Sequence, residues 1–159
     1  MIKYIISGGQ TGADIAGLDA AITNNIMIGG WAPHGWKQKD GPNLELRDKY
    51  KLREHSGGYK ERTWENIKVS TGTIRCCVDF YSPGEICTLN GIKKFNKPYF
   101  DVYLPNPASH KDLLIWVLRY NIEILNVAGN TQGTRDQDIY GMTFQYISRF
   151  LKYIKSIQS

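Results

Sequence analysis

The chain has 159 residues, 42% of them hydrophobic, which suits a single folded domain over residues 1–159. Its three cysteines, two of them adjacent, form no disulfide framework, and the three histidines lie at no zinc-ligand spacing. The net charge is +5 at pH 7, and the basic residues are only loosely clustered along the chain. This distribution favours an anionic small ligand over a nucleic acid.

Short apolar runs alternate with helical periods in the first part of the chain. Residues 2–6 predict a buried strand, and the small residues that follow predict a helix over 12–24. A second strand is expected over 26–32. The segment 34–58 is polar, rich in glycine and charge, and has no sustained period, so we expect a long functional loop there.

The same alternation continues to the end of the chain, with a turn at Ser82-Pro83-Gly84 before one of the helices. The expected helices cover residues 59–68, 83–95, 109–120 and 137–157, and the expected strands cover 73–78, 99–103 and 122–127. Strands that alternate with helices predict an α/β Rossmann-like three-layer sandwich with a mostly parallel sheet.

Glycines follow three of the predicted strands at their carboxyl ends. Gly8 and Gly9 follow the first strand, Gly84 follows the middle strand, and Gly129 follows the last. Ligands of parallel α/β sheets bind outside the carboxyl ends of the strands. The sequence therefore predicts a ligand site where these breaks meet.

The first of these breaks is a glycine-rich turn between a strand and a helix. Such a turn points backbone N–H groups at an anion, and the helix dipole favours the negative charge. The hydroxyl and amide side chains between the glycines are not needed for a tight turn, so they favour a phosphate-binding loop over simple packing. The loop is Ser7-Gly8-Gly9-Gln10-Thr11-Gly12, and it is neither a P-loop nor a G-x-G-x-x-G motif.

Two charged residues near this loop have alternative roles. Asp14 either stabilises the amino end of its helix or accepts hydrogen bonds from a ribose hydroxyl or a base amine. Arg62 either grips a phosphate with its guanidinium or pairs with a neighbouring glutamate on a helix surface.

A series of short motifs in the chain resembles a known family. The motifs are Ile6-Ser7-Gly8-Gly9-Gln10-Thr11-Gly12-Ala13-Asp14, Gly29-Gly30-Trp31, Asp40-Gly41-Pro42, Leu52-Arg53-Glu54, Arg62-Thr63, Asn66 and Asn126-Val127-Ala128-Gly129. Together they resemble the putative molybdenum carrier family, a circularly permuted, YpsA-related branch of the SLOG Rossmann-like superfamily. The resemblance covers nearly the whole chain.

The resemblance implies a permuted SLOG fold with a nucleotide or nucleotide-derived ligand across its loops. Unpermuted relatives, such as the cytokinin-activating phosphoribohydrolases, begin with the strand and phosphate loop that residues 126–129 resemble here. The segment from Arg62 to Gly84 is similar to their arginine-bearing helix, middle strand and phosphate turn. The molybdenum label implies a molybdopterin-type ligand as an alternative, but no cysteine lies in the candidate loops to bind molybdenum itself.

The chain departs from the family's pattern at the middle turn and in the last loop. The middle turn, S-G-G-T in the family, reads Ser82-Pro83-Gly84-Glu85 here, so proline removes an N–H donor and glutamate adds a negative charge. The glutamate that assists base departure in the phosphoribohydrolases falls at about Asn90, which cannot ionise. In the last loop Thr131 and Gln132 replace an arginine and a glutamate, and Arg135 is a replacement cation.

We expect a cytoplasmic binding protein that carries or sequesters a phosphate-bearing nucleotide or related signal. The alternatives are an N-glycosidic hydrolase of nucleoside monophosphates with Glu85 as the catalytic carboxylate, and a molybdenum cofactor carrier. A third class, which the loose clustering of charge disfavours, is a nucleic-acid-binding accessory protein. No metal or obligatory cofactor, no membrane partner and no nucleic acid is expected, and the chain is expected to form a homodimer or higher homo-oligomer. The expected ligand-binding residues are Ser7, Gly8, Gly9, Gln10, Thr11, Gly12, Asp14, Arg62, Ser82, Gly84, Glu85, Gly129, Asn130, Thr131 and Arg135.

Overall fold

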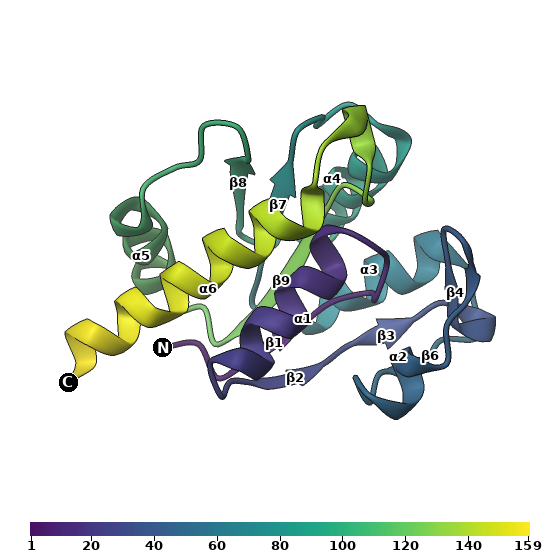
Figure 1. Cartoon of the computed structure of the whole chain (residues 1–159), viewed down its shortest axis with the longest axis horizontal. Helices are drawn as coiled ribbons and strands as arrows, with labels where there is room; N and C mark the ends of the chain where they lie inside the picture. Colours follow the sequence, from purple (N-terminus) through teal and green to yellow (C-terminus); the bar gives the residue numbers. More distant parts are fainter.

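The computed structural model describes all 159 residues and is built on one five-stranded parallel sheet (Figure 1). The strands lie in the order β2-β1-β9-β7-β8, and every neighbouring pair is parallel. Their bounds are β1 Tyr4–Ile6, β2 Met27–Gly29, β7 Gly72–Cys77, β8 Tyr99–Tyr103 and β9 Ile124–Gly129. The Rossmann-like α/β fold expected from the sequence is confirmed.

Helices cover both faces of the sheet. The first face carries α1 (Ala13–Thr23), α5 (His110–Arg119) and α6 (Ile139–Gln158), which share a core of 22 buried residues with the strands. The second face carries α3 (Tyr59–Val69) and α4 (Pro83–Phe95), which pack against each other. Because both faces are covered, β7 is buried along its whole length, including Thr73 and Arg75.

The expected strand over 26–32 is two strands in the structure. It divides at Gly30, whose φ of +127° lies in the region that favours glycine and whose Cα lies against the backbone oxygen of Ser7. Any side chain at this position would collide with that oxygen. After the break, β3 (Trp31–Ala32) leaves the main sheet and pairs with β6 (Arg53–Glu54).

The segment 34–58 differs from the expected irregular loop, because it contains short elements and a small core. A 3-10 turn at His34–Trp36 leads into a hairpin of β4 (Lys37–Gln38) and β5 (Gly41–Pro42), followed by α2 (Glu45–Asp48). Leu46 of α2 forms a second apolar cluster with Leu18, Ala32, Tyr50 and Leu52, and Trp36 packs against this cluster. Each element is too short to give a periodic pattern in the sequence.

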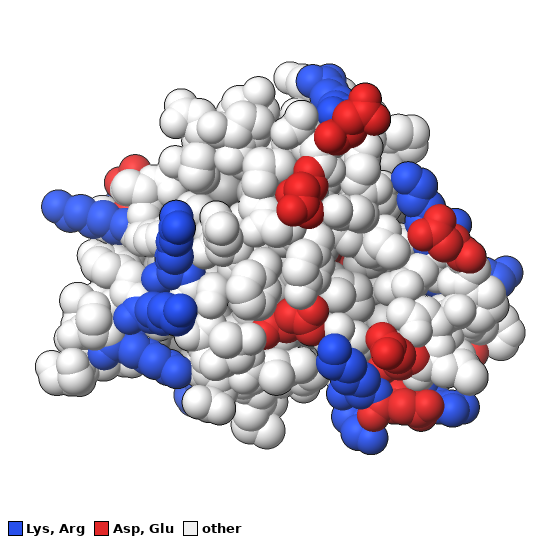
Figure 2. Space-filling model, in the orientation of Figure 1, with Lys and Arg blue, Asp and Glu red and all other residues white.

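The basic residues form no single continuous stripe on the face drawn in Figure 2. Lys and Arg gather over the carboxyl-terminal part of α6, and a second group near α2 and β6 alternates with Asp and Glu. None of the helices combines the length and the apolar character that crossing a membrane requires.

Candidate functional site

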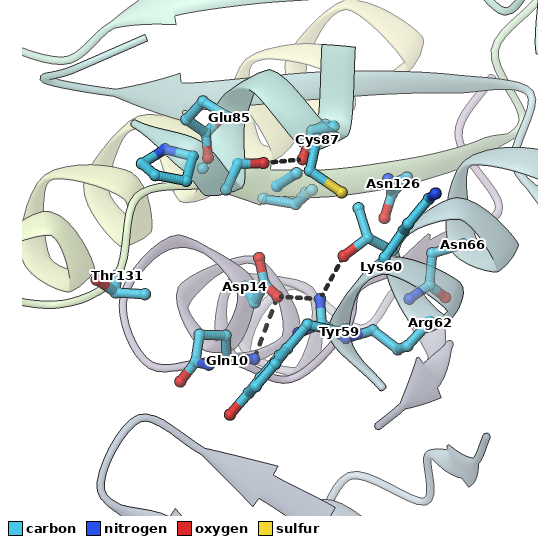
Figure 3. A pocket seen from close by; sticks show the side chains of 18 of the residues that line it. Gln10, Asp14, Tyr59, Lys60, Arg62, Asn66, Glu85, Cys87, Asn126 and Thr131 are labelled. Carbon is cyan, nitrogen blue, oxygen red and sulfur yellow. Dashed lines mark hydrogen bonds and ion pairs between the residues drawn. The ribbon is translucent and has the colours of Figure 1, made fainter. Parts of the chain in front are cut away.

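A cavity of about 590 Å³ opens at the carboxyl ends of β1 and β9, between the glycine-rich loop, α3 and the start of α4 (Figure 3). This is the edge where the sequence predicts a ligand site. Eight of the expected residues line it: Gly8, Gln10, Asp14, Arg62, Gly84, Glu85, Gly129 and Thr131.

The buried pair of Asp14 and Arg62 lies at the centre of the cavity wall. Arg62 Nη1 is 3.6 Å from Asp14 Oδ2, and each side chain is 8% exposed. Burial raises the pKa of Asp14 to about 6, although the Arg62 charge and the N–H groups of Gln10 and Gly8 lower it. With this pKa the Asp14 carboxyl is mainly ionised at neutral pH and pairs with the guanidinium.

The Arg62 guanidinium keeps donors that the protein does not use. Its one hydrogen bond runs from Nη1 to Thr63 Oγ1 at 3.2 Å, while Nε is buried without an acceptor. Burying a donor without a partner costs free energy, so the packing around Arg62 must keep the side chain in this position. Gly8 leaves the space that the guanidinium occupies, because even a single Cβ there would overlap it.

The donors of the glycine-rich loop are mostly engaged within the loop. The Gln10 N–H donates to Asp14 Oδ2 at 3.1 Å, and the Gly9 N–H donates to Ser7 Oγ at 3.3 Å. The Ser7 hydroxyl in turn donates to the Asp14 carbonyl at 3.0 Å, and the Thr11 N–H donates to Gln10 Oε1 at 3.0 Å. The Asp14 carboxylate thus lies where an anion on this loop would accept hydrogen bonds.

Four expected residues of the glycine-rich loop do not line the cavity wall. Gly9 has a φ of +78°, and a Cβ there would lie 2.9 Å from the side chains of Leu46 and Leu52. Gly12, with a φ of +89°, lies against the backbone of residues 130–132. Ser7 is buried beneath the loop, whereas Thr11 and Gly12 border a second cavity on its other side.

Glu85 lies in the first turn of α4 and is 3% exposed. Its Oε2 accepts a hydrogen bond from Cys77 Sγ at 3.2 Å. Burial raises the pKa of Glu85 to about 7, and the Asp14 charge contributes to this rise, while the thiol and Arg75 lower it. The cavity therefore contains a carboxyl group that can be protonated or ionised near neutral pH.

Three further expected residues lie around the cavity rather than in its wall. Ser82 is the amino-terminal cap of α4 and accepts from the Glu85 N–H at 3.4 Å. Asn130 Oδ1 accepts from the N–H groups of Val78 and Asp79 at 2.8 and 3.0 Å, which ties the end of β9 to the end of β7. Arg135 is exposed and pairs with Asp79 at 3.5 Å.

The structure also brings residues to the cavity that sequence reasoning missed. Tyr59, Thr63 and Asn66 share the face of α3 that carries Arg62, so their spacing of three to four residues was a usable signal. Lys39 reaches the cavity from the β4–β5 hairpin, which no local pattern predicts. The other missed lining residues are Lys60, Pro83, Cys87, Thr88, Asn126, Val127 and Ala128.

A parallel, doubly covered sheet with a ligand-sized cavity at the carboxyl ends of its strands defines a Rossmann-like α/β domain. More narrowly, the chain belongs to the circularly permutated YpsA SLOG family, whose model matches residues 5–151. It is similar to a crystal structure, at 1.45 Å resolution, of a "Putative molybdenum carrier protein" from Syntrophus aciditrophicus SB. The two share 35% identity with a TM-score of 0.83, over 94% of this chain and 95% of that one. None of the curated proteins matches the chain.

Proposed function

We propose that the protein binds a phosphate-bearing nucleotide or nucleotide-derived metabolite in this cavity and carries or sequesters it without turnover. The observation that supports this most is the Arg62 side chain. It is nine-tenths buried at a cavity of about 590 Å³, yet its contacts with hydrogen-bond acceptors involve Nη1 alone. A ligand with several acceptor oxygens supplies what this guanidinium lacks.

The other polar groups of the cavity suit the remaining parts of such a ligand. Asp14 and Glu85 accept hydrogen bonds from ribose hydroxyl or base N–H groups. The Gly129–Thr131 segment and the start of α4 at Gly84 complete the rim. Gly84 leaves open space beside its backbone, because a Cβ there would have no neighbour within 4 Å.

A molybdopterin-type ligand belongs to the same chemical class, since it combines a heterocycle with a phosphate, and the name of the relative from Syntrophus makes it a candidate. A metal ion held directly by side chains does not fit this cavity. Its one thiol, Cys87, has a pKa raised by burial and so keeps its proton. No three His, Cys, Asp or Glu side chains of the chain are arranged to hold a metal ion.

The proposal is tested with calorimetric titration and thermal shift on a panel of nucleoside monophosphates, cyclic nucleotides and ADP-ribose derivatives. At least one compound should bind and raise the melting temperature, because a ligand of the native state stabilises it by mass action. Arg62→Ala should abolish this stabilisation, whereas Arg47→Ala, which removes the same charge from an exposed site, should retain it. A panel without any binder would refute the proposal.

A second candidate, hydrolysis of the N-glycosidic bond of nucleoside monophosphates, is favoured by one observation. The raised pKa of Glu85 allows its carboxyl group to donate a proton near neutral pH, which is what departure of a base requires. Asn90, by contrast, is exposed on α4 and does not line the cavity. Release of free base by the wild type, and its loss in Glu85→Gln, would establish the hydrolase over the carrier.

A further inference from the structure

The β4–β5 hairpin, residues 37–42, lies against the glycine-rich loop and is fixed there by amide side chains. Gln38 Nε2 donates to the Gly9 carbonyl at 2.7 Å, and the Lys39 N–H donates to Gln10 Oε1 at 2.7 Å. Gln38 Oε1 also accepts from Asn43 Nδ2 at 3.0 Å. These bonds place the hairpin at the cavity independently of any ligand.

The hairpin brings the Lys39 side chain to the cavity, where its charge has no carboxylate partner. Lys39 lines the cavity and takes part in no ion pair. Its one side-chain hydrogen bond is a long one of 3.5 Å from Nζ to the Gln132 carbonyl. Arg62, in contrast, lies beside Asp14. The third cation of the cavity, Lys60, lies over the Trp64 ring, 4.6 Å from its centroid. Lys39 is therefore the cavity cation that has neither a carboxylate nor an aromatic ring against it.

The cavity thus has cations at both ends, Lys39 at one and Arg62 with Lys60 at the other, and only Arg62 is paired with a carboxylate. In Figure 3 Asp14 lies between Thr131 on one side and Arg62 on the other, with Gln10 near the Thr131 end. The Lys39 side chain is at the Thr131 end, since it bonds to the neighbouring residue 132. An anion at the other end would meet the Asp14 carboxylate that lies beside Arg62, whereas no carboxylate pairs with Lys39.

We propose that Lys39 binds the anionic group of the ligand at the Thr131 end of the cavity, so that a nucleotide lies with its phosphate under the hairpin and its sugar and base toward Asp14 and Arg62. The free donors of Arg62 then bind acceptor oxygens of the sugar and base. This orientation rests on the proposed function, and it adds the residue that selects a phosphorylated ligand over an unphosphorylated one. Gln10 supports Lys39 by holding its backbone.

Lys39→Gln and Lys37→Gln provide a matched pair, because both remove one charge from the same hairpin but only Lys39 lines the cavity. Titration calorimetry would measure the 5′-monophosphates of adenosine, guanosine, cytidine and uridine, together with the nucleosides. Lys39→Gln should weaken binding of the tightest monophosphate about fivefold, the size of a contact worth about 1 kcal/mol, and leave the nucleoside unchanged. Lys37→Gln should stay within about twofold of the wild type.

The outcomes separate this inference from the function on which it rests. Equal losses in the two lysine variants, or an equal loss for nucleoside and monophosphate, overturn the orientation and leave the binding function intact. If none of the monophosphates, cyclic nucleotides and ADP-ribose derivatives binds to the wild type, both proposals are overturned. If monophosphates alone fail to bind, only the orientation is overturned. For Lys39→Gln, added salt should also weaken monophosphate binding less steeply than it does for the wild type, because one screened charge contact is missing.

Discussion

Replacing Glu85 by Gln changes the most strongly perturbed acid of the cavity without changing its shape. The side chain is 3% exposed, and burial raises its pKa from the ordinary 4.5 to about 7. A difference of this size between the folded and unfolded states corresponds to about 3 kcal/mol. The amide of Gln can still accept the hydrogen bond from Cys77, so the local contacts are retained.

The direction of the effect follows from proton binding. Between pH 4.5 and about 7 the folded protein holds more protons at Glu85 than the unfolded chain does. The free energy of unfolding therefore falls as the pH rises through this window, and the contribution of the protonated carboxyl is fully present below it and lost above it. Gln has no proton to lose. The free energy of unfolding of Glu85→Gln, taken relative to that of the wild type, should thus be about 3 kcal/mol higher at the upper end of this pH window than at the lower end.

Urea denaturation, followed by tryptophan fluorescence at a series of pH values, measures this difference. Glu45→Gln is the control, because it makes the same substitution at an exposed position of α2. Its unfolding free energy should run parallel to that of the wild type. If the unfolding free energy of Glu85→Gln also runs parallel to that of the wild type, burial does not destabilise the ionised Glu85 carboxylate. The electrostatic description of the cavity would then be wrong.

Three substitutions test the packing around the loop and the geometry of the guanidinium. Gly8→Ala should displace Arg62 and lower the melting temperature by several degrees in a thermal melt, whereas Gly84→Ala, which meets no atom within 4 Å, should melt like the wild type. Gly9→Val should lower the free energy of unfolding by more than about 1 kcal/mol in urea denaturation. The backbone φ is +78° there, and the added atoms would meet two buried leucines. Wild-type stability of this variant would contradict the prediction. Arg62→Lys should weaken ligand binding roughly tenfold in calorimetry, because an ammonium cannot form the guanidinium fork; unchanged affinity would indicate a diffuse charge effect.

The regular part of the fold could be predicted because its signals are local. The alternation of apolar runs and helical periods gives the parallel sheet, and β8 and its neighbours begin and end close to the predicted residues. The strand over 26–32 was predicted as one element because the break at Gly30 depends on a contact with Ser7, more than twenty residues away. Segment 34–58 has no period because its order comes from tertiary packing on Leu18 and its neighbours.

The candidate site was predictable where a motif coincides with a strand end. Gly8, Asp14 and Gly129 follow strands in the sequence and line the cavity in the structure. The role of Asp14 as the internal acceptor for loop N–H groups was not predictable, since it depends on the direction of the side chain. Lys39 was missed for a related reason: its position is set by hydrogen bonds to Gly9 and Gln10, about thirty residues earlier.

The second apolar cluster, to which α1 and β3 contribute Leu18 and Ala32, anchors segment 34–58 apart from the larger core. Only five buried residues hold it, and the hairpin that it supports is joined to the glycine-rich loop mainly through amide hydrogen bonds. Such a unit opens at a lower free energy than the main core, so its backbone amides should exchange with deuterium while those of β7 remain protected. Because the hairpin borders the cavity, each such opening would break the hydrogen bonds from Gln38 to Gly9 and from Lys39 to Gln10 and so move Lys39 away from the glycine-rich loop.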